Sequence, residues 1–210
     1  MPFEIELIKG LQSGRNDFFD VFFSGYAYLA SVWAVILISI LIFFLYNKKV
    51  GFAYAITEGF AFLTTFVLKK IIQRPRPFVA ASSILNLGHE SGYSFPSGHL
   101  TCAIVTAIFL FYIAHRSFNK KWKIILTDVC AVLFILLMML DRMYLGVHYL
   151  TDTLAGIAVG GIWCAVALVV LPPLGRVWDK LWAKIVQKHK ERKQQKNQAK
   201  EESKEVGNKN

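Results

Sequence analysis

Three short motifs that combine cations, imidazoles and a carboxylate lie at the edges of hydrophobic segments of this chain. They read Lys69-x6-Arg76-Pro77, Pro96-Ser97-Gly98-His99 and Arg142-x5-His148-x3-Asp152. Together they supply the groups needed to hold a phosphate and to attack its phosphorus with a histidine. Polar groups that gather at one depth of an apolar chain mark its functional site, so these motifs define the candidate site.

The second motif has the residues of a helix start. The first N–H groups of a helix lack intrahelical partners and carry partial positive charge, so they attract anions. Gly98 permits close approach of the backbone and Ser97 adds a hydroxyl, which together predict a phosphate cradle. A Ser97 that merely caps the helix after Pro96 is an equally good interpretation of this motif taken alone.

The third motif pairs an imidazole with a carboxylate. His148 and Asp152 are four residues apart, so on a helix they share one face. Asp152 can accept the Nδ1 proton of His148 and leave Nε2 free as a nucleophile. A lone interfacial histidine near a capping carboxylate is the alternative. The pair is favoured because a carboxylate inside an apolar helix is costly without a partner.

The candidate phosphate ligands are Arg142, Arg76 and Lys69. Arginine binds phosphate oxygens through a planar fork, and lysine binds them as a point charge. Each cation alone is better explained as an anchor that snorkels to the membrane surface, and only the combination predicts an anion site. We interpret the neighbouring Lys70 and Arg74 as such anchors.

The composition is that of an integral membrane protein. Of the 210 residues 55% are hydrophobic, and the mean hydropathy is +0.43, which is too apolar for an ordinary soluble domain. The formal net charge is +10, and the segment from Arg176 onward holds 11 Lys and Arg against 5 Asp and Glu. Because this basic tail follows an apolar helix, its expected partner is anionic lipid and not nucleic acid.

Two further features of the composition bear on function. The three cysteines are scattered through apolar segments and provide neither a disulfide framework nor a metal-ligand spacing. Cations and backbone donors cover the charge of a phosphate, and the chain offers no carboxylate cage for Mg²⁺, so we expect no metal site and no cofactor. The acidic start of the chain does not resemble a cleaved signal peptide.

The hydrophobic segments predict an all-α, polytopic transmembrane helical bundle. About five spans are expected, at 26–46, 50–68, 99–115, 124–140 and 149–171, since about 20 apolar residues cross the hydrocarbon. Residues 1–22 predict an amphipathic segment at the membrane surface; their charges disfavour a sixth span. We place a membrane-embedded domain at 1–172. At 173–210 we expect a basic, cytoplasmic amphipathic helix followed by a disordered tail.

The distribution of cations predicts the orientation. Lys48-Lys49, the cluster from Arg116 to Lys123 and the basic tail fall on one side of a five-span bundle. The positive-inside rule makes that side cytoplasmic, and the C-terminus with it. All three motifs then lie at the outer face of the cell membrane. Between the first two motifs, Glu90 is interpreted as ordinary loop polarity, with a role in substrate entry as the alternative.

The three motifs resemble the signature motifs of the type 2 phosphatidic acid phosphatase superfamily, which includes lipid phosphate phosphatases and vanadium haloperoxidases. The resemblance runs from Lys69 to Asp152, and the five-span frame suits a small bacterial membrane member. Asp141 departs from the pattern, because the family usually has a small residue before the arginine. This acid is expected to pair with Arg142 or to bias substrate choice. Glu58, inside the second span, is expected to make a structural polar contact.

The resemblance implies a role for each motif residue. His148 would attack phosphorus and form a phosphohistidine, with Asp152 orienting it. His99 would protonate the leaving oxygen and then activate water. The phosphoryl oxygens would be held by Lys69, Arg76, Ser97, Gly98 and Arg142.

The function predicted in this way is that of a metal-independent membrane phosphatase acting on a lipid phosphate monoester or diphosphate. Phosphatidylglycerophosphate, undecaprenyl diphosphate and phosphatidic acid are the candidate substrates. A lipid-to-lipid phosphotransferase would use the same site, so the motifs do not separate it from a hydrolase. A non-catalytic, lipid-binding membrane protein is the third possibility, although no catalytic residue of the motifs is missing.

Overall fold

The computed structural model describes residues 2–171 and Gln187. The chain forms two compact units, Met1–Ala167 and Leu168–Asn210. All the predicted site residues belong to the first unit. The helix and tail expected at 173–210 lie outside the described residues, apart from Gln187.

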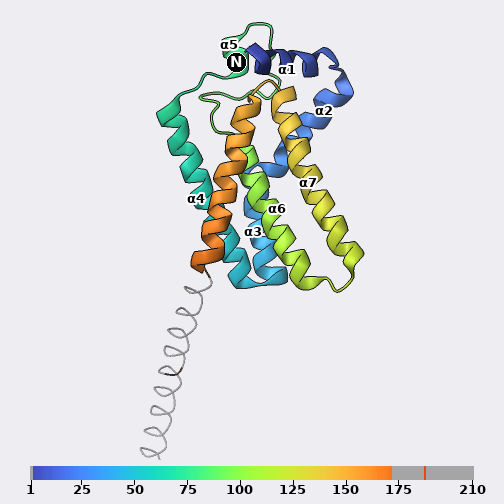
Figure 1. Ribbon diagram of the computed structural model, residues 1–210, viewed down its shortest axis with the longest axis vertical. Coiled ribbons are helices and arrows are strands. Elements are labelled where there is room, and N and C mark those ends of the chain that lie inside the picture. The colour runs from blue at the N-terminus through green and yellow to red at the C-terminus, as the bar shows by residue number, and fades with distance from the viewer. Residues whose placement is uncertain (1, 172–186, 188–210) are drawn as a thin grey trace, which may run out of the picture. The chain divides into compact units, whose positions relative to one another are not determined.

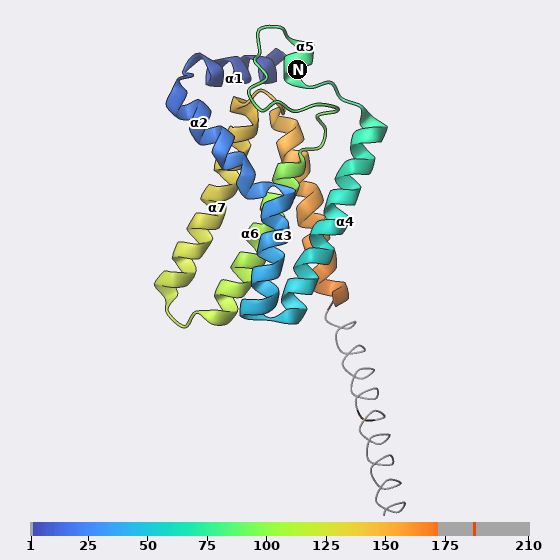
Figure 2. The same ribbon diagram turned by 180° about the vertical axis from the view of Figure 1, so that it is seen from behind.

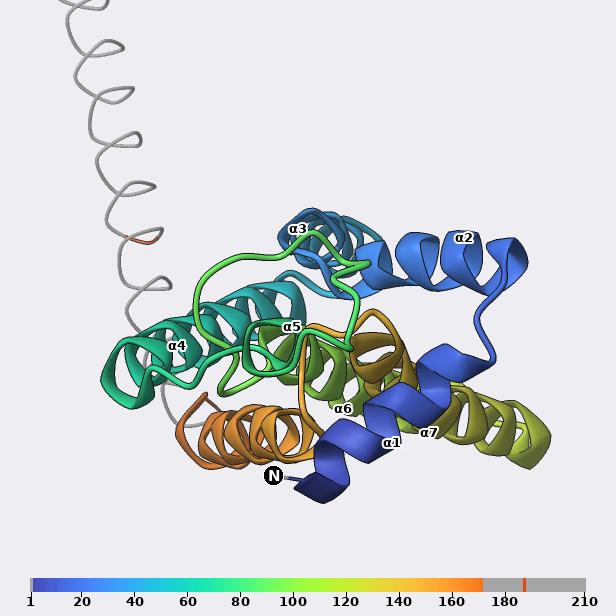
Figure 3. The ribbon, with the colours of Figure 1, turned by 90° about the horizontal axis from the view of Figure 1, so that it is seen from above.

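The described part of the first unit is helical and contains no strand. Four elements, α3 (Val32–Leu41), α4 (Lys48–Ile72), α6 (Gly98–Ser117) and α7 (Lys121–Tyr144), run lengthwise through a bundle together with a further helix, Leu150–Leu171 (Figure 1, Figure 2). Helix α1 (Pro2–Ser13) lies across one end of this bundle and contacts α7 (Figure 3).

The predicted spans are found, one of them in bent form. Within the described part of the chain, four helical segments are long and apolar enough to cross a membrane, namely Lys48–Ala80, which includes α4, and α6, α7 and Leu150–Leu171. A fifth span exists if the segments Asp17–Ala30 and Val32–Tyr46, which meet at 52°, count as one. The predicted all-α bundle is therefore confirmed. The helices α6 and α7 are longer than expected, at 20 and 24 residues.

The bend arises at Ser31, inside the segment predicted as one continuous span. Helix α2 (Asp17–Tyr26) continues into the short 3₁₀ helix η1 (Ala27–Ala30), after which Ser31 is extended at φ −77° and ψ 163°. The Ser31 hydroxyl accepts a hydrogen bond from the N–H of Ala34 and so starts α3 as a new helix. A π-helical turn, η2 (Ile42–Tyr46), then leads into α4.

Close packing of two helices brings the second and third motifs together. A Cβ atom on Gly156 would lie 2.5 Å from the Ser97 carbonyl oxygen, and one on Gly160 would lie 2.6 Å from that of Thr101. Only glycine at these positions lets the helix Leu150–Leu171 approach the first turn of α6 so closely. The N–H of Ser97 donates to the carbonyl oxygen of Asp152 at 3.0 Å across the same contact.

The two ends of the bundle differ in chemistry. The end of α4, the short helix α5 (Pro77–Ala80), the start of α6 and the end of α7 meet at the end that α1 covers (Figure 1). The α3–α4 and α6–α7 turns, which carry Lys48 and Lys121, lie at the opposite end. The structure thus separates the three motifs from these cations, as the sequence predicted.

Candidate active site

The first motif is positioned by the way α4 ends. Gln73 adopts the left-handed conformation, with φ 51°, and its N–H bonds the carbonyl oxygen of Lys69. Pro77 then begins α5 at a position where no N–H is needed. The chain therefore folds back over the end of the bundle. Arg76 is buried there, with only 3% of the residue exposed.

The loop between the first two motifs binds both cations of the first motif through backbone oxygens. The ammonium of Lys69 donates to the carbonyl oxygens of Tyr93 and Ser94 at 2.9 and 3.1 Å. The guanidinium of Arg76 donates to the carbonyl oxygen of Ser91 at 2.9 Å and to that of Val147 at 2.9 Å. Arg76 thereby connects the loop to the segment just before His148.

The arginine of the third motif is buried and only partly satisfied. Arg142 is 2% exposed, and its Nε donates to the Asp141 carboxylate at 2.5 Å. Its Nη1 lies 3.4 Å from the ring of His99. Its Nη2 has no hydrogen-bond partner among the residues that the structure describes. The expected pairing of Asp141 with Arg142 is present, and one donor of the guanidinium is left for a ligand.

The histidine and carboxylate of the third motif form the predicted pair. Nδ1 of His148 lies 3.4 Å from Oδ2 of Asp152, which also accepts the N–H of Tyr149 at 2.9 Å. Both side chains are almost fully buried. Burial, followed by the charges of Lys69 and Arg76, lowers the pKa of His148 to about 4, against the opposing effect of the Asp152 hydrogen bond. The imidazole is therefore neutral at neutral pH, as a nucleophile requires.

The second motif begins α6 as expected. Ser97 is the N-cap residue, and its hydroxyl accepts the N–H of Leu100 at 3.5 Å. The capping interpretation of Ser97 is thus realised in the structure. His99 is in the first turn, beside Arg142 and near the carboxylate of Glu90, with its Nδ1 3.6 Å from Oε1 of Glu90. Both imidazoles, His99 and His148, interact electrostatically with Glu90.

Glu90 belongs to this site, which the interpretation as ordinary loop polarity did not anticipate. Its carboxylate pairs with Nη2 of Arg76 at 2.8 Å and with Nη1 of Arg142 at 3.0 Å. Burial would raise the pKa of Glu90, but the imidazoles and then Arg76 and Arg142 outweigh it and bring that pKa to about 2. The carboxylate is therefore an internal anion between the two arginines. Its only sequence signal is that Glu90 is the one acidic residue in the otherwise cationic stretch 69–97.

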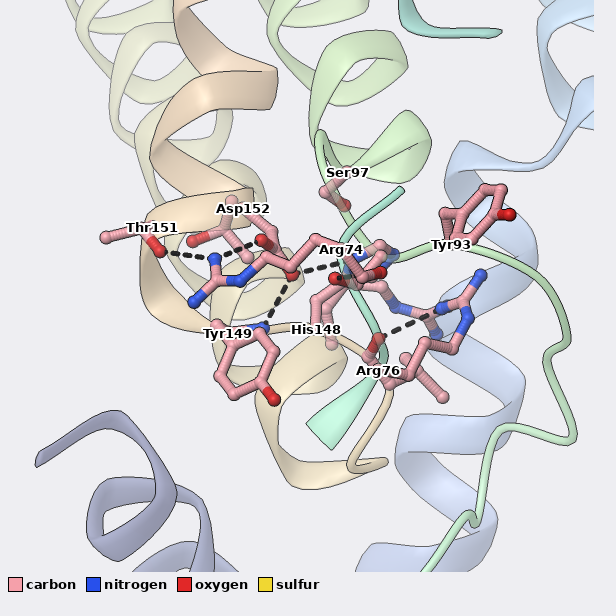
Figure 4. A network of polar contacts seen from close by, with 12 residues as sticks. Arg74, Arg76, Tyr93, Ser97, His148, Tyr149, Thr151 and Asp152 are labelled. Atoms are coloured by element: carbon pink, nitrogen blue, oxygen red, sulfur yellow. Dashed lines mark hydrogen bonds and ion pairs between the residues drawn. The ribbon is translucent and has the colours of Figure 1, made fainter. Parts of the chain in front are cut away.

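Arg74 is also part of the site, and its interpretation as a snorkelling anchor was wrong. Because the chain turns at Gln73, the Arg74 side chain points inward to Asp152 and Thr151 and lies over the ring of Tyr149 (Figure 4). Lys70, in the last turn of α4, is exposed and lies over the Phe66 ring. For Lys70 the anchor interpretation remains suitable.

A cavity of about 260 Å³ opens beside His99, Arg142 and Glu90. Its other wall is formed by the bend between α2 and α3, including Tyr28 and Ser31. The cavity therefore joins the apolar bent segment to the charged centre. Away from the site, Glu58 makes the structural contact expected of it and accepts a hydrogen bond from Thr106 at 3.3 Å.

Sequence comparisons find relatives among lipid phosphatases. The chain is 34% identical over 128 residues to phosphatidylglycerophosphatase B of Bacillus subtilis, a match that covers 60% of each chain. It is 32% identical over 164 residues to the undecaprenyl-diphosphatase BcrC of the same organism, covering 76% of this chain and 78% of the relative.

Two solved structures share the fold. The structure of Aquifex aeolicus LpxE matches with a TM-score of 0.66 and 26% identity, over 78% of this chain and 93% of that one. The transmembrane PAP2-type phosphatidylglycerolphosphate phosphatase of Bacillus subtilis matches with a TM-score of 0.70 and 24% identity, over 79% and 83% of the two chains. The PAP2 superfamily profile matches residues 48–176, more than half of the sequence and all three motifs. This multi-pass membrane protein therefore belongs to the PAP2 superfamily.

Proposed function

We propose that this protein is a lipid phosphatase that hydrolyses a phosphate monoester or diphosphate through a phosphohistidine on His148. The observation that carries the proposal is the buried Nη2 of Arg142, which has no hydrogen-bond partner among the described residues, in a cluster whose Glu90 interacts electrostatically with both imidazoles and both arginines. A buried donor without a partner is costly, so a site that keeps one is suited to a ligand that supplies acceptors. A phosphoryl group supplies them in tetrahedral array.

The proposed reaction has two steps. Nε2 of His148 attacks phosphorus, the bond from phosphorus to the lipid oxygen breaks, and that oxygen takes a proton from His99. In the second step His99 removes a proton from water, the water oxygen attacks phosphorus, and the phosphorus–nitrogen bond breaks to release phosphate. Asp152 holds Nδ1–H of His148 through both steps, so that Nε2 stays the reacting nitrogen.

The protein's remaining contribution is charge stabilisation. Phosphoryl transfer depends mainly on positioning and on neutralising the equatorial oxygens. Lys69, Arg76 and Arg142 are the proposed cationic ligands, with Ser97 and the backbone at Gly98 as further donors. No step needs a metal, so activity should persist in EDTA.

The substrate class follows from the relatives and from the membrane setting. The two relatives described above are named for phosphatidylglycerophosphate and undecaprenyl diphosphate. We propose that a lipid of this kind reaches the site at the outer face of the cell membrane, with the basic C-terminal tail on anionic lipid at the cytoplasmic face. The positive-inside distribution of Lys and Arg supports that orientation.

Phosphate release from purified full-length protein in detergent with EDTA tests the proposal, across a panel of lipid monophosphates and diphosphates. The wild type should release phosphate from at least one member, and His148→Ala should lower kcat by at least about 10³-fold. His115→Ala is the matched control, because His115 also lies near an aspartate, Asp128 at 3.6 Å, but at the far end of α6. A folded wild type that acts on no lipid phosphate would refute the proposal. Label passed to a second lipid instead of water would identify a phosphotransferase.

A further inference from the structure

Helix α1 is docked onto the active site by buried polar contacts, which an amphipathic helix lying on a membrane does not require. Its buried residues are Glu4 and Ile8. Ile8 packs in a cluster with Ile84, Met143 and Tyr149. At the other end of α1, Gln12 donates to the carbonyl oxygens of Leu85 and Tyr144 at 3.0 and 2.9 Å. The helix is thus fixed at two points.

The carboxylate of Glu4 reaches the third motif. Its Oε1 accepts the N–H and the hydroxyl of Thr151 at 2.9 and 2.8 Å. Its Oε2 accepts from Nη2 of Arg74 at 2.9 Å. Burial would raise the pKa of Glu4, but the Thr151 hydrogen bonds and Arg74 outweigh it and lower that pKa below its usual value. A carboxylate that is 8% exposed and held ionised in this way is bound in place, since its desolvation is offset only by these partners.

Arg74 continues the connection from Glu4 to the proposed dyad. Its Nη1 donates to Oδ1 of Asp152 at 2.5 Å and to the Thr151 hydroxyl at 2.6 Å. Its guanidinium carbon lies 3.9 Å from the centre of the Tyr149 ring. Asp152 therefore has its two oxygens divided: Oδ1 faces Arg74, while Oδ2 faces His148 and the N–H of Tyr149. With both oxygens engaged, the carboxylate cannot rotate away from His148.

We propose that Arg74 is a positioning residue for the Asp152–His148 dyad and that Glu4 holds Arg74 in place, so that α1 forms part of the active-site frame. Arg74 touches neither His99 nor Arg142 in the contacts above, so it acts through Asp152 and not on the phosphoryl group. The inference rests on the phosphatase function proposed above. The proposal gives α1 a role in the reaction although α1 is far from the dyad in sequence. Glu4 and Thr151, for example, are 147 positions apart.

The test uses full-length protein in detergent and compares Glu4→Gln, Arg74→Lys, Arg74→Ala and Thr151→Ala. The matched control is Glu6→Gln, because Glu6 is also on α1 but is 69% exposed and pairs only with Lys9 in the contacts described. Each preparation is assayed for kcat, KM, the Ki of orthovanadate and the Tm.

Arg74→Ala should lower kcat by about 10- to 100-fold, the effect of losing a hydrogen bond between charged groups. Glu4→Gln and Thr151→Ala should lower kcat by about 3- to 10-fold, and Arg74→Lys should restore part of the loss. KM and the vanadate Ki should stay within about 2-fold of wild type, because the phosphate ligands are untouched. In the Arg74→Ala background, Glu4→Gln should add almost nothing, since its effect acts through Arg74.

Four results would overturn the inference. The kcat of Glu4→Gln could equal that of Glu6→Gln, or the effects of Glu4→Gln and Arg74→Ala on kcat could be additive. The loss could also appear in the Ki of vanadate, or kcat could fall only as far as the Tm does. If Glu4→Gln fails to fold, Thr151→Ala decides by the same criteria. If the wild type is active and the variants keep its kcat, only this inference is refuted. If the wild type is folded but inactive, the proposed function is refuted as well.

Discussion

Replacing Glu90 by glutamine should tighten the binding of phosphate-like anions. The Glu90 carboxylate pairs with Nη2 of Arg76 at 2.8 Å and with Nη1 of Arg142 at 3.0 Å. These are the arginines proposed to hold the phosphoryl oxygens. An incoming anion therefore has to displace Glu90 or accept its negative charge nearby, and both cost free energy.

The size of the effect follows from these two contacts. A hydrogen bond to a charged group contributes about 1.5–3 kcal/mol. Glutamine keeps an acceptor for one arginine, and the Glu90 side chain is 25% exposed, so solvent screens part of the interaction. The net gain for a bound anion is then about 1–2 kcal/mol, which corresponds to a Kd lower by about 5- to 30-fold.

The assay is the thermal midpoint as a function of orthovanadate concentration. Without ligand the Glu90→Gln protein should melt lower than wild type, since Arg76 and Arg142 both lose the charge of Glu90, although Arg142 keeps its pair with Asp141. As vanadate is added, the Tm of Glu90→Gln should begin to rise at a lower vanadate concentration than the Tm of wild type, because the Kd for vanadate is smaller. Glu6→Gln is the charge-matched control. A Kd for vanadate that is unchanged or weaker in Glu90→Gln would refute the reasoning and make Glu90 a support of the arginines instead of a competitor.

Three other predictions address pH, the buried acid of α4 and helix packing. Since burial and then the charges of Lys69 and Arg76 bring the pKa of His148 to about 4, kcat/KM should fall with acidification only near pH 4; a limb near about 6.5, the value of an ordinary histidine, would contradict this. Glu58→Gln should keep kcat within about 2-fold, because Gln retains an acceptor for Thr106, and a large loss of kcat at unchanged Tm would give Glu58 a role in the reaction. Gly156→Ala should destabilise the protein by about 1–3 kcal/mol, seen as a lower Tm and lower activity, because its Cβ would lie 2.5 Å from the Ser97 carbonyl oxygen; an unchanged Tm would show that the two helices can separate without penalty.

The main architecture and the proposed dyad could be predicted because they depend on local patterns. Apolar length determines which helices can cross a membrane. His148 and Asp152 form the expected pair, although His148 lies two residues before the helix Leu150–Leu171 and not on it. The start of α6 at Gly98 follows from Ser97 as its cap. Each of these inferences uses residues within one or two helical turns of each other.

The residues that were missed depend on tertiary contacts. Arg74 was interpreted as an anchor because a single cation beside an apolar segment favours that interpretation, whereas the left-handed Gln73 turns the chain inward. Glu4 meets Arg74 across 70 positions, and Glu90 meets Arg142 across 52. Such pairs follow no sequence periodicity, because the conformation of the connecting loops determines which distant residues meet. The bend at Ser31 was hidden for a related reason, because one serine in an apolar segment is compatible with a continuous helix.

The most direct test of the proposed function is to trap the phosphoryl group on the protein. Full-length protein is mixed with a phosphate-labelled lipid substrate, quenched in base to preserve phosphohistidine, digested and mapped by mass spectrometry. Wild-type protein quenched within the first turnover should carry label on His148, because His148 is proposed to receive the phosphoryl group; His148→Ala should carry none. Label on another residue, or equal labelling of His148→Ala, would contradict the assignment of His148 as the nucleophile.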